Sequence, residues 1–263
     1  KTTVLFSALW SYAFLAGLSP SIVRAVTMFS FLSVGLVFRH KNPVERTLVS
    51  SALLLLLFNP FYLFDLGFQM SYTAVFSIVF IQPIFARLWK PKYRILNYFW
   101  QLTTVSLAAQ LGLLPISLYY FHQFPGLFLL ANLGVIPLLG LVLAFGFLLL
   151  FLGAIHFLPP WICDFYSFLI VSLNSFVSWV AAQDAFVFDE ISFSRGKLLF
   201  SLLLLAAFFV FLKFKTFLKL AVFLLCVSLL QGVFIFEKIK TSSRSELIVF
   251  QQHKESNLLL VNR

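Results

Sequence analysis

Long apolar runs, separated by short charged or proline-containing connections, constrain the fold of this chain more than any other feature. A transmembrane helix needs about 20 predominantly apolar residues to cross a hydrocarbon core about 30 Å thick. Apolar residues make up 61% of the 263 residues and charged residues only 11%, too few to cover the surface of a water-soluble domain of this size. The sequence therefore predicts an all-α fold, a polytopic transmembrane helical bundle.

The apolar runs divide the chain into eight or nine candidate transmembrane segments. They lie near residues 3–18, 20–38, 48–64, 67–85, 99–121, 127–152, 161–181 and 197–236, the last splitting in two at Lys213, Lys215 and Lys219. Two interpretations are open for 161–181, because Asp164 and three serines recur there at helical spacing. Such a pattern also fits an amphipathic helix lying at the membrane interface.

Short loops rich in Lys and Arg predict the orientation, because cytoplasmic loops carry an excess of these residues. Three connections, 39–46, 86–98 and 213–219, hold ten of the nineteen Lys and Arg residues. All three lie on the cytoplasmic side if 161–181 crosses the membrane. Both ends of the chain are then extracytoplasmic.

The character of the chain changes near its end, where two short β-like runs, 245–250 and 257–261, flank a polar stretch. We therefore predict a transmembrane domain over 1–236, and in 237–263 the start of an extracytoplasmic β-containing region that is truncated here. A tail without a folded partner is the alternative. Because the chain opens on Lys1 with a short apolar run, we also expect it to be a piece of a longer protein.

Six polar side chains are the candidate functional residues, since ionisable and amide groups are costly in hydrocarbon unless they face protein or water. In the orientation above, five lie in the outer half of the membrane and one near its middle. The five are Arg24, Asn59, Asp65, Gln69 and Asn132, and the sixth is Gln110. Their shared depth predicts a water-filled vestibule that opens outward.

Each of these residues also has a purely structural interpretation. Arg24 can extend to lipid headgroups or pair with Asp65. The amide side chains can hydrogen-bond between helices, which contributes about 0.6 kcal/mol each. Arg24 is interpreted as the only cation at membrane depth.

Prolines inside the apolar segments predict helix breaks, because proline removes a backbone donor and clashes with the preceding turn. Breaks are expected at Pro60, Pro115 and Pro137, with a tight or re-entrant turn over 112–126. An ordinary proline kink is the alternative for the stretch 112–126.

Catalytic motifs are not visible in this sequence. It has no glycine-rich phosphate loop, its four histidines do not have metal-ligand spacing, and its two cysteines lie in different apolar segments. We therefore expect no enzymatic activity, metal or cofactor in this chain.

Five ordered stretches lie at 17–25, 59–75, 108–115, 120–124 and 131–137, and include GLSPSIVRA and DLGFQMSYTAV. Together they resemble the competence domain of the ComEC family. The resemblance implies a channel in the bacterial inner (plasma) membrane that passes single-stranded transforming DNA into the cytoplasm. It also implies a DNA receptor outside and a helicase-like ATPase inside as partners, and leaves a homo-oligomer open.

This resemblance gives the candidate residues their expected roles. Arg24 would contact phosphates at the outer mouth, and Phe68, Tyr72 and Phe121 would offer stacking surfaces. A basic loop would form an inner docking or exit surface, or act only as a topology signal that touches anionic lipid. Its cations are Arg87, Lys90, Lys92 and Arg94. Two other functions stay open: a transporter or flippase for a small or lipid-linked substrate, and a membrane anchor for soluble domains.

Overall fold

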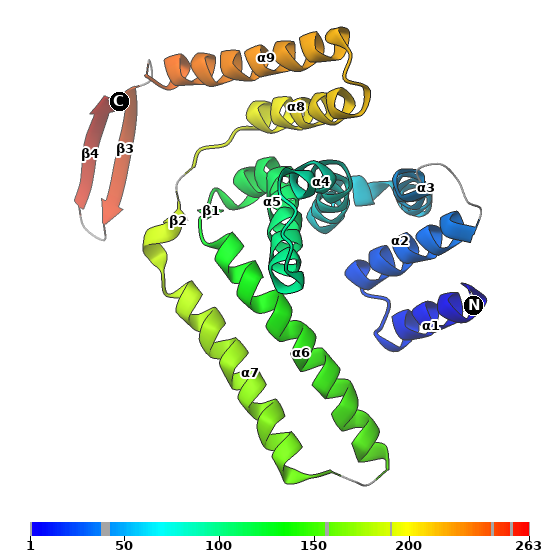
Figure 1. Ribbon diagram of the computed structural model, residues 1–263. Coiled ribbons are helices and arrows are strands. Elements are labelled where there is room, and N and C mark those ends of the chain that lie inside the picture. Colours follow the sequence, from blue (N-terminus) through cyan, green and yellow to red (C-terminus); the bar gives the residue numbers. More distant parts are fainter. Residues whose placement is uncertain are drawn as a thin grey trace. The chain divides into compact units, whose positions relative to one another are not determined.

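Helices dominate the computed structural model, which describes residues 2–37, 43–155, 158–189, 191–242, 245–252 and 255–262. Within these residues there are nine α-helices (Figure 1), namely α1 (Thr2–Leu15), α2 (Pro20–Val37), α3 (Pro43–Phe58), α4 (Leu66–Leu88), α5 (Arg94–Phe121), α6 (Phe128–Ala154), α7 (Pro160–Ala181), α8 (Arg195–Phe214) and α9 (Phe217–Ser242). The all-α membrane bundle that the apolar runs predict is confirmed.

Short elements connect or follow these helices. The 3-10 helix η1 (Pro60–Phe64) joins α3 to α4, and η2 (Asp184–Phe186) follows α7. Strands β1 (Phe124–Pro125) and β2 (Val187–Phe188) pair antiparallel, with Phe124 opposite Phe188. Strands β3 (Ser245–Gln252) and β4 (Glu255–Asn262) form an antiparallel hairpin with Ser245 opposite Asn262.

The nine helices correspond one to one to the nine predicted segments. Six of them, α4 to α9, are long and apolar enough to cross a membrane, judged by length and composition over the described residues. Helix α7, which covers the segment 161–181, is one of these six. The largest shift is at the third segment, where α3 begins at Pro43 and η1 replaces the expected last turn.

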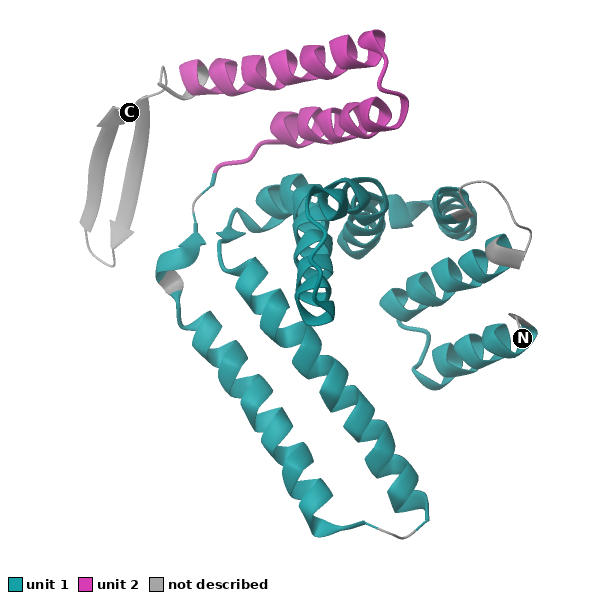
Figure 2. Ribbon diagram, in the orientation of Figure 1, with its two compact units in different colours: residues 1–191 teal, residues 192–263 magenta. Residues whose placement is uncertain are grey.

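The chain forms two compact units, residues 1–191 and 192–263 (Figure 2). The first contains α1 to α7, and the second contains α8, α9 and the β3–β4 hairpin. The boundary expected after residue 236 falls within α9, which continues to Ser242, and the division into transmembrane and β-containing domains stays a prediction. Continuous helical hydrogen bonding carries α9 beyond its apolar stretch.

Close packing of α4 on α5 forms the centre of the first unit. Ser77 of α4 and Thr104 and Ala108 of α5 are fully buried. A Cβ placed on Gly112 of α5 would lie 1.8 Å from Ser77 Oγ. Small residues of this kind allow helix backbones in a membrane to approach closely.

A second core holds the start of α4 against α2 and α3. It consists of Leu55 from α3 with Phe68 and Tyr72 from α4, and Val23 of α2 packs against it. The rings of Phe68 and Tyr72 lie 4.5 Å apart, and the Tyr72 hydroxyl donates to Ser51 Oγ at 3.2 Å. This core fixes the position of the first turn of α4.

The expected helix breaks are corrected at two of three prolines. Helix α5 continues through Pro115, and α6 continues through Pro137. Proline removes only one hydrogen bond of the ladder, and in a membrane the freed carbonyl can be satisfied by neighbouring helices or local adjustment. At Pro60 the break is present, because α3 ends at Phe58 and Pro60 begins η1. A turn follows α5, which ends at His122 in the left-handed conformation with φ 57°.

Candidate functional site

Arg24, in the second turn of α2, forms an ion pair with Asp65 immediately before α4. Arg24 Nη1 lies 3.2 Å from Asp65 Oδ2. The Arg24 side chain is 11% exposed, whereas that of Asp65 is 42% exposed. A largely buried guanidinium needs an acceptor for its donors and a countercharge, and Asp65 supplies both. The pairing expected from the sequence is therefore present.

Asp65 is also the N-cap of α4. Its Oδ2 accepts from Phe68 N at 3.0 Å, and its Oδ1 accepts from Gly67 N at 3.4 Å. An aspartate at this position satisfies amide donors that have no partner within the helix, and the helix dipole favours its negative charge. The carboxylate is therefore held in place by the backbone as well as by Arg24.

Gly67 gives the guanidinium the space to lie against α4. A Cβ built on Gly67 would lie 2.8 Å from Arg24 Nη2 and 3.3 Å from its Cζ. Sequence reasoning missed this residue, although its position in the capping turn after Asp65 was visible. Only the three-dimensional placement of α2 beside α4 gives that glycine a role.

Asn59 and Gln69 bind the backbone of η1, the short helix that precedes α4. Asn59 Oδ1 accepts from Phe61 N at 3.1 Å and caps η1. Gln69 Nε2 donates to Leu63 O at 2.9 Å. These amides therefore stabilise the corner between α3 and α4. We call the set of Arg24, Asn59, Asp65 and Gln69 the α4 cap cluster.

Gln110 and Asn132 lie on other helices. Gln110 is half-buried midway along α5, and Asn132 is half-buried near the start of α6. Asn132 lines a pocket of about 310 Å³, together with Gln183 and the aromatic side chains of Phe128 and Phe186. Among the described residues, no hydrogen bond joins Gln110 or Asn132 to the α4 cap cluster.

The three aromatic stacking candidates fall into two groups. Phe68 and Tyr72 are buried in the core beneath the start of α4, so the expectation that they offer open stacking surfaces is corrected. Their apolar surface is used to pack α4 on α3, as is usual for aromatic residues in a phenylalanine-rich chain. Phe121 is exposed at the end of α5.

An apolar pocket of about 410 Å³ adjoins Arg24 between α2, α3 and α4. Met28 and Leu32 of α2 line it, with Leu48 of α3 and Val75 of α4. Among the described residues that line it, Arg24 is the charged one. The site therefore combines one guanidinium with a hydrocarbon-lined space.

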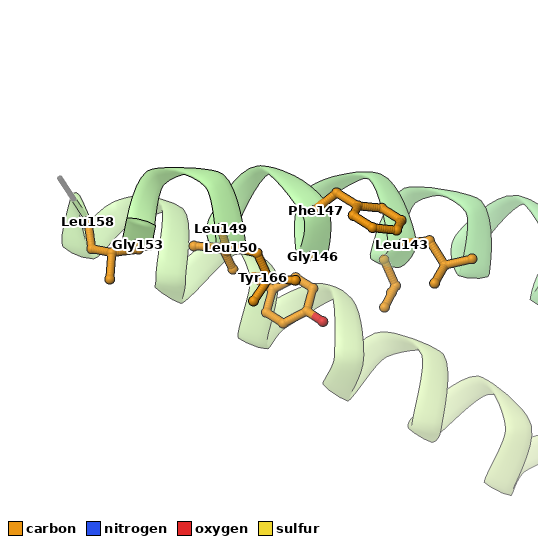
Figure 3. Close-up of a pocket in the computed structure, with 9 residues that line it drawn as sticks. Leu143, Gly146, Phe147, Leu149, Leu150, Gly153, Leu158 and Tyr166 are labelled. Atoms are coloured by element: carbon orange, nitrogen blue, oxygen red, sulfur yellow. The ribbon is translucent and has the colours of Figure 1, made fainter. Parts of the chain in front are cut away.

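A larger pocket of about 660 Å³ lies between α6 and α7 (Figure 3). Leu143, Phe147 and Leu150 line it from α6, and Tyr166 faces it from α7. None of the described residues that line this pocket is charged. Its surface suits hydrocarbon, so it is a poor site for an anionic ligand compared with Arg24.

In the second unit, Lys197 forms a buried polar centre that the sequence reasoning missed. Its Nζ lies 3.0 Å from Glu237 Oε2, donates to Ser192 O at 3.1 Å and lies 4.8 Å from the centre of the Phe234 ring. The Ser194 hydroxyl donates to the Glu237 carboxylate and accepts from Lys197 N. Lys197 is 8% exposed within the candidate span Arg195–Phe214. Lys197 is therefore a buried cation within a candidate span, in addition to Arg24.

The signal for this pair was present in the sequence but spread over two segments. Lys197 begins one apolar run and Glu237 ends the next, and each looks like a boundary residue when taken alone. Because α8 and α9 form an antiparallel hairpin, the first turn of α8 lies beside the last part of α9. Hairpin pairing brings the two charges together.

The basic loop lies between α4 and α5. Its four cations are all exposed, namely Arg87, Lys90, Lys92 and Arg94. Arg87 is in the last turn of α4, where the helix dipole favours a positive charge. The loop therefore presents a compact cationic surface at one end of the α4–α5 pair.

Within the described part of the chain, no group of three His, Cys, Asp or Glu residues is arranged to hold a metal ion. The two cysteines described are free thiols on α7 and α9. The chemistry of the described polar groups is thus that of ion pairs, helix caps and amide hydrogen bonds.

Comparison with known proteins links these observations to a family. The profile of a family described as "Competence protein" matches residues 1–233. ComE operon protein 3 of Bacillus subtilis (strain 168) is 37% identical over 126 residues, which are 48% of this chain and 15% of that protein. No solved structure gives a significant match.

Proposed function

Because this chain belongs to the Competence protein family, we propose that it forms the part of a membrane channel through which single-stranded DNA enters a bacterial cell. The family profile covers α1 to α8 and most of α9. Six of these helices, α4 to α9, are long and apolar enough to cross a membrane. The proposal places the chain in the bacterial plasma membrane, with both ends outside and without a catalytic role of its own.

The observation that carries this proposal is the burial of the Arg24 guanidinium beside a partly exposed carboxylate. DNA strands present a phosphate at each nucleotide, and a planar guanidinium binds phosphate through paired hydrogen bonds. Arg24 has a nearly buried guanidinium whose partner, Asp65, is partly open to the surroundings. Arg24 is therefore our candidate for the phosphate contact at the outer mouth.

One cation binds a polyanion weakly, because affinity grows with each phosphate that is neutralised. We therefore infer that the chain supports transit and that partners capture and drive the strand. A DNA receptor outside and a helicase-like ATPase inside fit these tasks, and a homo-oligomer would multiply the contacts. The exposed basic loop, Arg87 to Arg94, is the candidate docking or exit surface at the inner side, although its charges also suit anionic lipid headgroups.

The remaining candidates line the proposed path. Gln110 would contribute a polar group midway along α5, and Asn132 a second amide near the start of α6. The pocket beside Asn132 has aromatic and amide groups, which suit the faces and edges of nucleobases. Exposed Phe121 is the remaining stacking candidate.

Uptake of labelled DNA tests the proposal. In a strain that lacks the gene, uptake should be absent and should return with the full-length protein. The variant Arg24→Gln should insert normally and lower uptake by about tenfold or more, the effect of losing one charge-assisted hydrogen bond. Lys219→Gln, which removes a cation from the first turn of α9, is the matched control and should retain uptake. Normal uptake in the deletion strain would refute DNA import itself.

A second function is favoured by the pocket of about 410 Å³ beside Arg24. A guanidinium on the wall of an apolar pocket also suits an amphiphile with a phosphate group, as in a flippase for a lipid-linked substrate. Fluorescent phospholipid exchange between the leaflets of vesicles containing the full-length protein separates the two functions. Exchange that depends on Arg24, with DNA uptake unaffected by Arg24→Gln, would favour the flippase. If substitutions in the membrane helices change neither DNA uptake nor phospholipid exchange, the chain serves as an anchor for soluble domains.

A further inference from the structure

We propose that Asp65 is the resting counter-ion of Arg24 and releases the guanidinium to a DNA phosphate while remaining bound to the start of α4. This inference rests on the proposed function, since it assigns Arg24 a phosphate ligand. It adds a regulatory role for Asp65 at the same site.

Two sets of donors hold the Asp65 carboxylate. Its Oδ2 lies 3.2 Å from Arg24 Nη1 and 3.0 Å from Phe68 N, and its Oδ1 lies 3.4 Å from Gly67 N. The backbone amides are enough to keep an aspartate at an N-cap. Loss of the contact with Arg24 therefore leaves Asp65 anchored, and the exchange requires no unfolding of α4.

The burial of the pair is asymmetric. Arg24 is 11% exposed, while Asp65 is 42% exposed, so the carboxylate forms the open side of the ion pair. An anion that reaches Arg24 must share the guanidinium with Asp65 or displace it. Asp65 therefore competes directly with any incoming phosphate.

The guanidinium has more donors than Asp65 uses. Arginine has five N–H donors, and the ion pair is a single contact through Nη1. Among the described residues, no hydrogen-bond acceptor reaches the buried Nε atom, which is an unfavourable state for a donor. Nη2 lies against Gly67, 2.8 Å from the position that a Cβ on that residue would take. A phosphate oxygen would supply acceptors that the resting pair lacks.

The resting pair also explains how a cation is kept at this position without a permanent ligand. An unpaired charge in a membrane segment is costly, and pairing with a carboxylate lowers that cost. A lone small anion must overcome the local carboxylate, whereas a DNA strand brings successive phosphates to the same place. Competition by Asp65 therefore favours brief contacts with a polyanion over stable binding of a monovalent anion.

The critical variant is Asp65→Asn, which removes the charge and keeps a side chain that caps helices as well as aspartate does. In the full-length protein in phosphatidylcholine vesicles, a fluorescent single-stranded oligodeoxynucleotide should bind about two to five times more tightly than to wild type, the size of a partly exposed ion pair. The matched control is Asp189→Asn, which neutralises an exposed carboxylate that follows β2 and should leave affinity unchanged. If Asp65→Asn is not inserted, Asp65→Ser provides the same test with another capping residue.

A double variant makes the assignment specific. The gain from Asp65→Asn should disappear in an Arg24→Gln background, because the competition acts only through Arg24. Unchanged or weaker binding of inserted Asp65→Asn, or a gain that persists without Arg24, would overturn the counter-ion role. If Arg24→Gln weakens binding and Asp65→Asn does not strengthen it, only this inference fails. If Arg24→Gln has no effect on binding or uptake, the phosphate contact fails as well.

Discussion

Lys197 in the first turn of α8 and Glu237 in α9 are joined by an ion pair of 3.0 Å across the helical hairpin. Lys197 lies in the first turn of α8, where the helix dipole disfavours a positive charge. The carboxylate of Glu237 neutralises that charge across the hairpin. The pair therefore fixes the register of α8 against α9.

Replacing one partner should loosen this hairpin. Glu237→Gln leaves the Lys197 ammonium buried without its countercharge, and we expect the free energy of unfolding to fall by about 1–3 kcal/mol. Thermal unfolding in detergent, followed by circular dichroism, measures the change. The double variant Lys197→Met with Glu237→Gln should recover most of the loss, since no unpaired charge then remains. Equal destabilisation in single and double variants would show that the loss has another cause.

Gly67→Ala tests the placement of Arg24 without removing its charge. The added Cβ would lie 2.8 Å from Nη2, and the end of the arginine side chain can move away at little cost to folding. We therefore expect normal membrane insertion and a fall in DNA uptake of about fivefold or more, approaching the effect of Arg24→Gln. Gly140→Ala on α6 is the matched control, because nothing lies within 4 Å of its added Cβ. Full uptake in Gly67→Ala would contradict the need for this position of the guanidinium.

Gly112→Ala should separate α4 from α5. Its Cβ would lie 1.8 Å from Ser77 Oγ and 3.2 Å from the carbonyl oxygen of Thr73, so the helices must move apart. Overpacking of this kind costs about 1–3 kcal/mol, seen as a lower melting temperature in detergent. Ser77→Gly in the same chain removes the nearest clash and should restore part of the stability. Gly232→Ala on α9, where the added methyl meets open space, should change little.

Tyr72→Phe distinguishes core packing from DNA stacking. The variant keeps the buried ring and loses only the 3.2 Å hydrogen bond to Ser51. We expect the free energy of unfolding to fall by about 1 kcal/mol and DNA uptake per inserted protein to stay unchanged. Quantitative membrane immunoblotting supplies the normalisation. A specific loss of uptake would restore Tyr72 as part of the DNA path.

The positions of the helices could be predicted because the hydrocarbon core of a membrane favours apolar side chains along the whole length of a span. Charged connections and apolar length locate nine segments, and the helices begin and end near the expected residues. Proline effects could not be predicted in the same way. The sequence shows that Pro115 lacks a donor, but continuation of α5 depends on how its neighbours accommodate the free carbonyl.

The candidate site could be predicted only at residues whose side chains are unfavourable in a membrane unless they have a partner. Arg24 and Asp65 stand out in an apolar chain because an unpaired charge is unfavourable there. Gly67 carries no such signal, since its role is to leave space for a side chain from another helix. Lys197 and Glu237 were hidden at the ends of apolar runs and become a pair only when α8 and α9 pack. Depth alone also could not show that, among the described residues, Gln110 and Asn132 make no hydrogen bond to the α4 cap cluster.

The small β1–β2 pair has a consequence for the path of the chain through the bilayer. It joins the turn before α6 to the segment after α7, and two further backbone hydrogen bonds, Gly126 N to Phe186 O and Ile191 N to His122 O, tie the same segments together. Segments that are hydrogen-bonded to each other emerge at the same membrane face. If α6 crosses the bilayer, α7 must therefore cross back to the same face. The pairing of these two segments thus constrains the topology independently of the distribution of Lys and Arg.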